Sequence, residues 1–365
     1  MLGPFGSGVL SVLIPQVRED FATTTGAVTA GITVYMVPFA VIQLVSGTLG
    51  ERWGLGRTVR VAYLLYAAVS ILTVVAPGIG LFLVGRALQG AVNAFLSPLL
   101  LAALASGAAP GRLGRLVGTF VAVQTAGVVL SPLVGGLAGE VDWRLAFIVP
   151  AVLAAGLAAL PMATGSASSA EPPRLRSALT RRVASISAVA AVAYLGIGGV
   201  SFVVALLVAD ELGAGPTTTG LVVAGFGVTG ILGGRLAGVL ADRFGPGTAA
   251  ALGSVVCAVA LPVIGLASSI GVVAAAWAFA GVGAALVWAG LGSMAVQAAP
   301  GNRGGATSVY SAFRFVGLAV APVVWLPLFH ADVSLPFVIA GALNLLVCPL
   351  ALRLGAALRP VTKRT

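Results

Sequence analysis

Long apolar segments alternate with short polar breaks along almost the whole chain. A transmembrane helix needs about 20 mostly apolar residues, and the pattern predicts twelve helices. Their ranges are 2–17, 26–50, 58–76, 79–105, 114–139, 144–162, 184–209, 217–241, 248–267, 270–298, 304–328 and 334–354. The first is short for a span, so either this helix is truncated or its true start lies upstream of Met1. Residues 164–182 are polar and rich in serine and proline, which predicts a flexible cytoplasmic linker.

The composition agrees with this pattern. Hydrophobic residues make up 59% of the chain and charged residues 8%, whereas a soluble domain carries about 25% charged residues. We therefore expect an integral membrane protein. The 50 glycines favour close helix packing. Cys257 and Cys348 both fall inside apolar runs and predict neither a disulfide framework nor a metal site.

The basic residues predict the orientation, because cytoplasmic loops carry an excess of Lys and Arg. If both termini are cytoplasmic, the inner connectors, helix ends and tail hold 16 of the 20 basic residues and the outer connectors hold only Arg18 and Arg144. Arg86 and Arg314 lie within spans. We therefore expect a multi-pass protein of the cell membrane (plasma or inner membrane). The net charge of +10 follows from this topology and does not indicate a nucleic-acid partner.

Two short stretches share one pattern of glycine, acid, arginine and glycine. They are Gly47-Thr-Leu-Gly-Glu51-Arg52-Trp-Gly54 and Gly238-Val-Leu-Ala-Asp242-Arg243-Phe-Gly245, separated by 191 positions (238 − 47). Further pairs keep nearly this spacing: Ala-Ala-Pro at 108–110 and 298–300, Gly127 and Gly317, Pro132 and Pro322, Gly80 and Gly271, and Gly90 and Gly281. The repeat predicts two homologous six-helix halves, 1–163 and 183–365, joined by the linker.

These stretches resemble the loop between the second and third helices of major facilitator superfamily transporters. The copy at 238–245 fits that pattern fully, whereas the copy at 47–54 has Gly50 and Glu51 in place of alanine and aspartate and two inserted residues after it. The resemblance implies an all-α membrane protein with twelve helices in two pseudo-symmetric bundles. It also implies a conformational latch that favours the outward-facing state. Its residues would be Gly47, Glu51, Arg52, Arg57, Gly238, Asp242 and Arg243. The alternative is an ordinary turn with inside-positive charge.

The fourth predicted helix carries Arg86, Gln89, Gly90 and Asn93. Residues three or four apart share a helix face, so these polar groups cluster. Arg-x-x-Gln-Gly resembles the fourth-helix motif of proton-coupled drug exporters in the superfamily. Because a charge in the membrane is costly, we expect a functional role; the alternative is an arginine that snorkels to water.

The fifth predicted helix carries a proline between glycines. Gly127, Ser131, Pro132, Gly135 and Gly136 resemble the Gly-x-x-x-Gly-Pro-x-x-Gly-Gly motif of the family's antiporters, with Ser131 replacing the second glycine. Proline removes a backbone hydrogen bond and glycine lets a neighbouring helix approach. The motif predicts a helix bend.

Gln124 and Arg314 hold equivalent places in the two halves (314 − 124 = 190), each roughly at the bilayer midplane. Arg314 has no acid in its own span and is a binding-site candidate; the alternative is pairing with backbone carbonyls or with Asn344. Other polar or aromatic residues are candidates to line a cavity. They are Tyr35, Gln43, Tyr63, Tyr194, Trp288, Gln297 and Asn344.

No motif of an enzyme, metal site or ATP-binding loop is present, so we expect neither catalysis nor a cofactor. The resemblance implies a monomeric secondary transporter that exports drugs or small metabolites, coupled to protons, by rocking its halves about a midplane cavity. Since no acid lies within a predicted span, protons would use an acid at a helix end such as Asp210 or Glu51. Two alternatives remain: an organic-anion exchanger that uses Arg86 and Arg314, and a transport-inactive sensor or scaffold.

Overall fold

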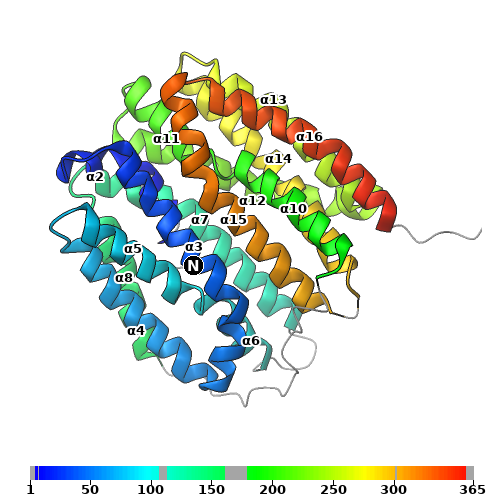
Figure 1. The fold of residues 1–365 in the computed structure, drawn as a ribbon, viewed down its shortest axis with the longest axis horizontal. Coiled ribbons are helices and arrows are strands. Elements are labelled where there is room, and N and C mark those ends of the chain that lie inside the picture. Colours follow the sequence, from blue (N-terminus) through cyan, green and yellow to red (C-terminus); the bar gives the residue numbers. More distant parts are fainter. Residues whose placement is uncertain (1–4, 7, 107–112, 161–178, 301, 359–365) are drawn as a thin grey trace, which may run out of the picture. The chain divides into compact units, whose positions relative to one another are not determined.

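The computed structural model describes residues 5–6, 8–106, 113–160, 179–300 and 302–358 (Figure 1). Every regular element in these residues is a helix, which confirms the predicted all-α class. The predicted linker at 164–182 falls almost entirely outside the described residues, as does the first Ala-Ala-Pro of the repeat.

The elements before the linker pair long helices with short connections. Their bounds are η1 Val9–Val12, α2 Ile14–Asp20, α3 Thr25–Arg52, α4 Leu55–Val74, α5 Ile79–Asn93, α6 Leu96–Ser106, α7 Leu113–Gly139 and α8 Leu145–Ala159. The elements after it follow the same plan. They are α10 Arg181–Gly196, α11 Ser201–Leu206, the π-helical turn η2 Leu207–Glu211, α12 Pro216–Phe244, α13 Pro246–Gly265, α14 Ile270–Gln297, α15 Arg303–Ala331 and α16 Leu335–Leu358.

Two predicted helices are interrupted. The fourth, 79–105, breaks at Ala94 and Phe95, because Pro98 has no N–H and its ring would clash with the carbonyl of Ala94. That carbonyl accepts a hydrogen bond from the Ser46 hydroxyl at 2.8 Å instead. The seventh, 184–209, breaks over Ile197–Val200, where two consecutive glycines lower helix propensity.

The first predicted helix, 2–17, is interrupted in the described residues: Phe5, Gly6 and Gly8 are helical, the 3₁₀ turn η1 follows, and the short helix α2 begins at Ile14. Nine helical segments of the described chain are long and apolar enough to cross a membrane, and two shorter apolar ones are Val123–Gly139 and Leu145–Ala159. The count of twelve spans stays a prediction.

The chain forms two compact units. Unit 1 comprises residues 1–172 and 202–224, and unit 2 comprises residues 173–201 and 225–365, so α12 contributes to both. This grouping follows packing and differs from the predicted division into 1–163 and 183–365, which stays a prediction.

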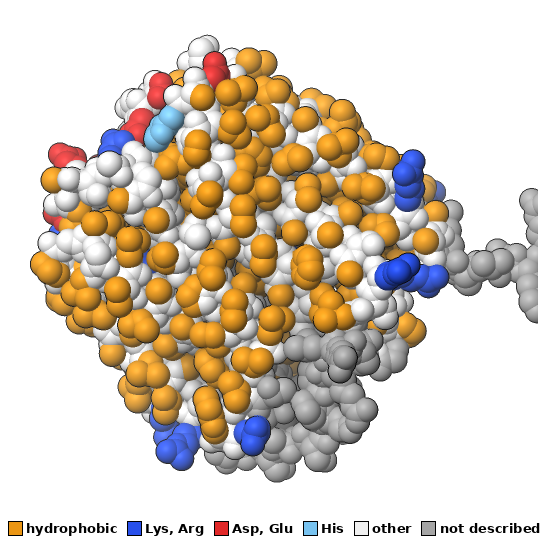
Figure 2. Space-filling model, in the orientation of Figure 1, with side chains coloured by type: hydrophobic (Ala, Val, Ile, Leu, Met, Phe, Trp, Pro, Cys, Tyr) orange, Lys and Arg blue, Asp and Glu red, His pale blue; other side chains and the backbone are white. Residues whose placement is uncertain are grey.

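Hydrophobic side chains dominate the visible surface, as expected where lipid and not water is the solvent (Figure 2).

The sequence repeat reappears in the element boundaries. Adding 191 to the starts of α3, α4 and α5 gives the starts of α12, α13 and α14 (216 − 25, 246 − 55 and 270 − 79). The connection before α4 and the connection before α13 each turn at a glycine in the left-handed region, with φ 91° at Gly54 and φ 92° at Gly245. Only glycine adopts this conformation without strain, so both copies of the motif need a glycine at its end.

The two copies also share a close backbone contact. A Cβ at Gly90 of α5 would overlap the carbonyl of Tyr35 in α3, and a Cβ at Gly281 of α14 would overlap the carbonyl of Phe226 in α12. Both residues of the second pair are displaced by 191 from the first. Each unit therefore holds two helices at a separation that only glycine permits.

A third shared feature is an aspartate that caps a helix start. Asp142 accepts a hydrogen bond from the backbone N–H of Arg144 at 2.9 Å, and Asp332 accepts one from the N–H of Ser334 at 2.7 Å. The Ser334 hydroxyl also donates to Asp332 at 2.6 Å. These bonds, the hydroxyl bond first, lower the pKa of the Asp332 carboxyl below its ordinary value.

The close contacts predict the effect of adding one methyl group. Gly90→Ala and Gly281→Ala should each reduce the free energy of unfolding in detergent by about 1–3 kcal/mol, because the helix backbones must separate. Gly80→Ala and Gly271→Ala are matched controls in the same helices, since a Cβ at either position meets nothing within 4 Å. They should leave the unfolding midpoint unchanged or slightly raised. Equal effects in both pairs would show that the close contacts do not limit packing.

Candidate functional site

Arg86 is fully buried in unit 1, with 0% of its surface exposed. One guanidinium nitrogen donates to the side-chain oxygen of Gln89 at 2.7 Å, and another donates to the carbonyl of Gly6 at 2.8 Å. The guanidinium carbon lies 4.4 Å from the ring centroid of Tyr35 and 5.6 Å from that of Phe147. The side chain therefore turns into the protein and does not snorkel to water.

The hydrogen bonds of Arg86 continue into a network over three helices. Gln89 donates to the hydroxyl of Ser70 on α4 at 2.9 Å, and Asn93 donates to the hydroxyl of Tyr35 on α3 at 2.5 Å. Gln89, Asn93 and Ser70 are also 0% exposed. The polar cluster expected from the spacing of α5 therefore exists, and it joins α3, α4 and α5 from within.

Among the described residues, the hydrogen-bond partners of Arg86 are an amide oxygen and a carbonyl oxygen, and its guanidinium lies beside aromatic rings. Such neutral partners orient a guanidinium and leave its charge uncancelled. The arrangement can attract an anion that comes near, or it can hold the three helices in one register. Because the side chain is fully buried, direct contact with a substrate requires movement in this part of unit 1.

In unit 2, Arg314 of α15 is half-buried. It donates to the Tyr194 hydroxyl at 3.5 Å, and its guanidinium carbon lies 4.5 Å from the centre of the Phe315 ring and 5.5 Å from that of Tyr194. Asn344 does not contact it: this amide donates to the Ala340 carbonyl of its own helix at 2.8 Å and packs against Gly196. Arg314 therefore has Tyr194 as a hydrogen-bond partner, and Asn344, the alternative expected from the sequence, bonds within its own helix.

Arg314 lies at the end of a row of aromatic rings. Tyr194 stacks on Trp288 with centroids 5.0 Å apart, Trp288 meets Phe226 edge-on at 5.8 Å, and Phe226 stacks on Trp277 at 4.4 Å. A half-buried cation beside stacked rings suits a ligand that combines an aromatic body with an acceptor or anionic group.

The sequence repeat contained a signal for part of this row, although helix periodicity alone did not reveal it. Phe226 and Trp277 are the counterparts of Tyr35 and Arg86, both displaced by 191. In unit 1 the cation lies 4.4 Å from the tyrosine ring, and in unit 2 the tryptophan ring lies 4.4 Å from the phenylalanine ring. One structural position therefore holds a cation–π pair in one copy and a ring stack in the other.

The other predicted lining residues are scattered. Gln124 of α7 donates to the Ser97 hydroxyl of α6 at 2.8 Å, Tyr63 is buried in the apolar core of unit 1, and Gln297 donates to Ser293 of its own helix at 3.0 Å. The side chain of Gln43 is partly buried. These residues share neither the network of Arg86 nor the row beside Arg314.

The proline motif of α7 forms close contacts within unit 1. Pro132 lies inside the helix, and the Ser131 hydroxyl donates to the carbonyl of Phe5 at 2.7 Å. A Cβ at Gly135 would lie 2.6 Å from Val12, and one at Gly136 would lie 2.6 Å from the carbonyl of Pro216. Gly127 is buried in the same helix. The Ser131 hydroxyl therefore holds Phe5 by a hydrogen bond, which a glycine at position 131 could not provide.

The described residues of the predicted latch lie near the ends of three long helices. Gly47, Arg52 and Arg57 belong to α3 and α4, whereas Gly238, Asp242 and Arg243 lie on α12. Arg52, Arg57, Asp242 and Arg243 are exposed. The side chain of Glu51 lies outside the described side chains, so the latch stays a prediction.

The described ion pairs involve the short helices and connectors that precede α3, α8 and α12. Arg18 meets Asp210 at 3.2 Å, and Arg144 meets Asp20 at 2.7 Å and Asp142 at 3.7 Å. A second nitrogen of Arg18 reaches the other oxygen of Asp210 at 3.4 Å, so this pair is bidentate. It joins residues 192 positions apart within unit 1.

The family model of the Major Facilitator Superfamily matches the chain twice, over residues 1–185 and 186–365. The chain belongs to this superfamily. Membership accounts for the repeat of 191 and for the motifs after α3 and α12, and it makes the protein a multi-pass membrane transporter.

Individual relatives are more distant. The MFS antiporter QDR3 of Candida albicans is 30% identical over 94 residues, which are 26% of this chain and 14% of that protein. The multidrug efflux pump LfrA of Mycolicibacterium smegmatis is 32% identical over 90 residues, which are 25% of this chain and 18% of the pump. The matches thus span less than a quarter of these curated relatives.

A similar solved structure is that of a bacterial homolog of the human lysosomal transporter Spinster, in an inward-facing and unoccupied conformation. It has a TM-score of 0.78 and 14% sequence identity, and the match covers 99% of this chain and 96% of that one. This confirms the fold of the superfamily for almost the entire chain.

The network around Arg86 predicts the effect of a charge-conserving substitution. Arg86→Lys should lower the free energy of unfolding in detergent by about 1–3 kcal/mol, because one ammonium cannot match the planar fork that reaches Gln89 and Gly6. Arg60→Lys, an exposed position on α4, is the control and should change nothing measurable. If both variants unfold at the wild-type midpoint, the network does not stabilise the helices.

Proposed function

We propose that this transporter exports aromatic drugs or small metabolites by alternating access. The observation that supports this proposal is the half-buried Arg314 at the end of the aromatic row of Tyr194, Trp288 and Phe226. Binding sites for small molecules are mostly apolar and aromatic, with a few polar groups that orient the ligand. The name of the efflux pump LfrA supports export as the direction of transport.

Proton coupling is the second part of the proposal. The acids of the described residues lie in connectors or at helix ends, so a proton-carrying carboxylate has to be one of these. Asp210 is the strongest candidate, because it already pairs with Arg18 and would release that arginine on protonation. We propose further that the protein works as a monomer in the cell membrane with both termini cytoplasmic.

An organic-anion exchanger is the competing function. Arg86 and Arg314 both lie within helices, and their hydrogen-bond partners among the described residues are neutral groups. A binding site with uncancelled positive charge favours an anion. The Spinster homolog, which shares the fold, adds a further transporter type to those of the curated relatives.

Transport in proteoliposomes separates the two functions. A thermal-shift screen of aromatic cations against aromatic anions first selects a ligand, and uptake of that ligand is then followed with an imposed pH gradient or with a trapped counter-anion. If the protein is a proton-coupled exporter, uptake of the ligand depends on the imposed pH gradient. Arg314→Gln should reduce uptake at least tenfold, because the ligand loses its orienting group.

Arg353→Gln removes the same charge from an exposed position of α16 and is the matched control, with uptake expected at the wild-type rate. Uptake that ignores the pH gradient, depends on the counter-anion and disappears in Arg314→Gln would replace the exporter with the anion exchanger. Absence of any ligand-dependent shift or uptake would favour the sensor or scaffold.

Two sets of charges would bias opposite conformations. Neutralising Asp242 with Asn should weaken the predicted latch and increase the inward-facing population, whereas neutralising Asp210 with Asn should break the ion pair with Arg18 and decrease it. An exposed pair contributes only about 0–1 kcal/mol, so each population should shift by up to about fivefold. Cysteine crosslinking at each membrane surface measures the shift. If Asp242→Asn and Glu51→Gln both leave crosslinking unchanged, these acids are only topological.

A further inference from the structure

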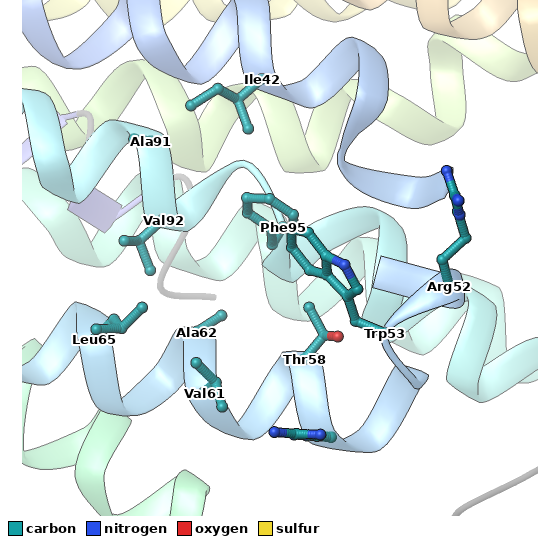
Figure 3. Close-up of a pocket in the computed structure, with 11 residues that line it drawn as sticks. Ile42, Arg52, Trp53, Thr58, Val61, Ala62, Leu65, Ala91, Val92 and Phe95 are labelled. Carbon is teal, nitrogen blue, oxygen red and sulfur yellow. The ribbon is translucent and has the colours of Figure 1, made fainter. Parts of the chain in front are cut away.

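A groove of about 640 Å³ lies in unit 1, and α3, α4 and α5 form its walls (Figure 3). Its size falls within the range of about 300–1,000 Å³ that is typical of sites for small molecules. The groove belongs to neither the Arg86 network nor the aromatic row of unit 2, since none of those residues lines it.

One end of the groove is apolar and faces the bilayer. Val61 and Leu65 of α4 line it and are 44% and 49% exposed, which in a membrane-spanning helix means exposure to lipid. Ala91 follows Arg86 by five residues on α5, and at 3.6 residues per turn it lies about 140° around the helix from it. The groove therefore opens away from the buried network.

The other end is basic and aromatic. Arg52, the last residue of α3, and Arg57, in the first turn of α4, both line it. Between them the exposed side chain of Trp53 stacks on Phe95 with centroids 6.2 Å apart and an interplanar angle of 23°. Tryptophan is enriched where hydrocarbon meets the headgroups, so this end lies at the level of the membrane surface.

The two arginines at this end have no ion-pair partner among the described side chains, which do not include that of Glu51. The described ion pairs use Arg18 and Arg144, so no described carboxylate neutralises Arg52 or Arg57. The left-handed turn at Gly54 joins the two helices tightly and keeps both arginines at the mouth of the groove. A guanidinium group presents a planar fork of donors that suits a phosphate, and this end of the groove carries two such groups.

We propose that the groove binds an anionic phospholipid, with its phosphate at Arg52 and Arg57 and one acyl chain along α5 between Val61, Leu65 and Val92. The order of charged, aromatic and apolar groups along the groove matches the order of headgroup, interface and hydrocarbon in the lipid. With the proposed orientation, the groove opens to the cytoplasmic leaflet, where anionic lipids concentrate. The lipid would be a bound component of unit 1, separate from any transported substrate.

Trp53 provides a direct readout, because bromine atoms on a lipid quench the fluorescence of a tryptophan that they touch. The full chain is reconstituted in nanodiscs that contain either phosphatidylglycerol or phosphatidylcholine with acyl chains brominated near the headgroup. The signal of Trp53 is the difference between the wild type and Trp53→Phe. We expect stronger quenching of this signal by brominated phosphatidylglycerol than by brominated phosphatidylcholine.

The arginine variants test the phosphate contact. Arg52→Gln and Arg57→Gln should each reduce the preference for phosphatidylglycerol by about fivefold. Arg60→Gln removes an equal charge from the same helix but from a residue outside the groove, and it should retain the preference. Equal loss in Arg60→Gln would mean general surface attraction and would overturn the proposal, as would equal quenching by the two lipids.

The acyl chain is tested separately. Ala91→Phe fills the apolar part of the groove without removing a charge, so it should also reduce the preference. Inorganic phosphate at matched ionic strength should not compete with the lipid. If phosphate abolishes the preference, or if Ala91→Phe retains it, the arginines bind a small anion only and the lipid proposal fails. Thermal unfolding of each variant shows whether a loss reflects unfolding, and none of these outcomes depends on transport.

Discussion

Contact between helix backbones determines how this protein is built. In lipid, apolar side chains gain little from leaving their surroundings, so helices associate by close packing and by polar contacts. Gly90 and Gly281 supply the packing, because each lies directly against a carbonyl of the neighbouring helix. The network of Arg86 depends on this arrangement, since α3 must approach α5 for the Tyr35 hydroxyl to reach Asn93.

Much of the architecture was predictable from the sequence. The long apolar runs gave most helix positions, and the spacing of 191 anticipated the equivalent boundaries. The break before α6 was not anticipated, although Pro98 marks its cause, because a proline within an apolar run can also be tolerated as a kink. The 3₁₀ turn within the first predicted helix was not anticipated, because hydrophobicity alone does not distinguish a 3₁₀ turn from an α-helix.

The candidate sites were predictable only in part. Residues on one helix face, such as Gln89 and Asn93, follow from periodicity, and the structure places both in one network. Contacts between distant segments do not follow from it: the partner of Arg314 is Tyr194, 120 positions away, and Asn344 bonds within its own helix. The groove beside Trp53 escaped notice for the same reason, since three separate helices contribute to it.

The two copies of the repeat differ at one equivalent contact. Arg86 lies 4.4 Å from the ring of Tyr35, and the ring of Trp277 lies 4.4 Å from that of Phe226. A cation held by directional hydrogen bonds tolerates little displacement, whereas stacked rings slide over one another at small cost. If unit 2 holds the ligand as proposed, its ring stack would accept ligands of varied shape. Substitutions among these rings would then change selectivity without disturbing the hydrogen-bond network of Arg86 in unit 1.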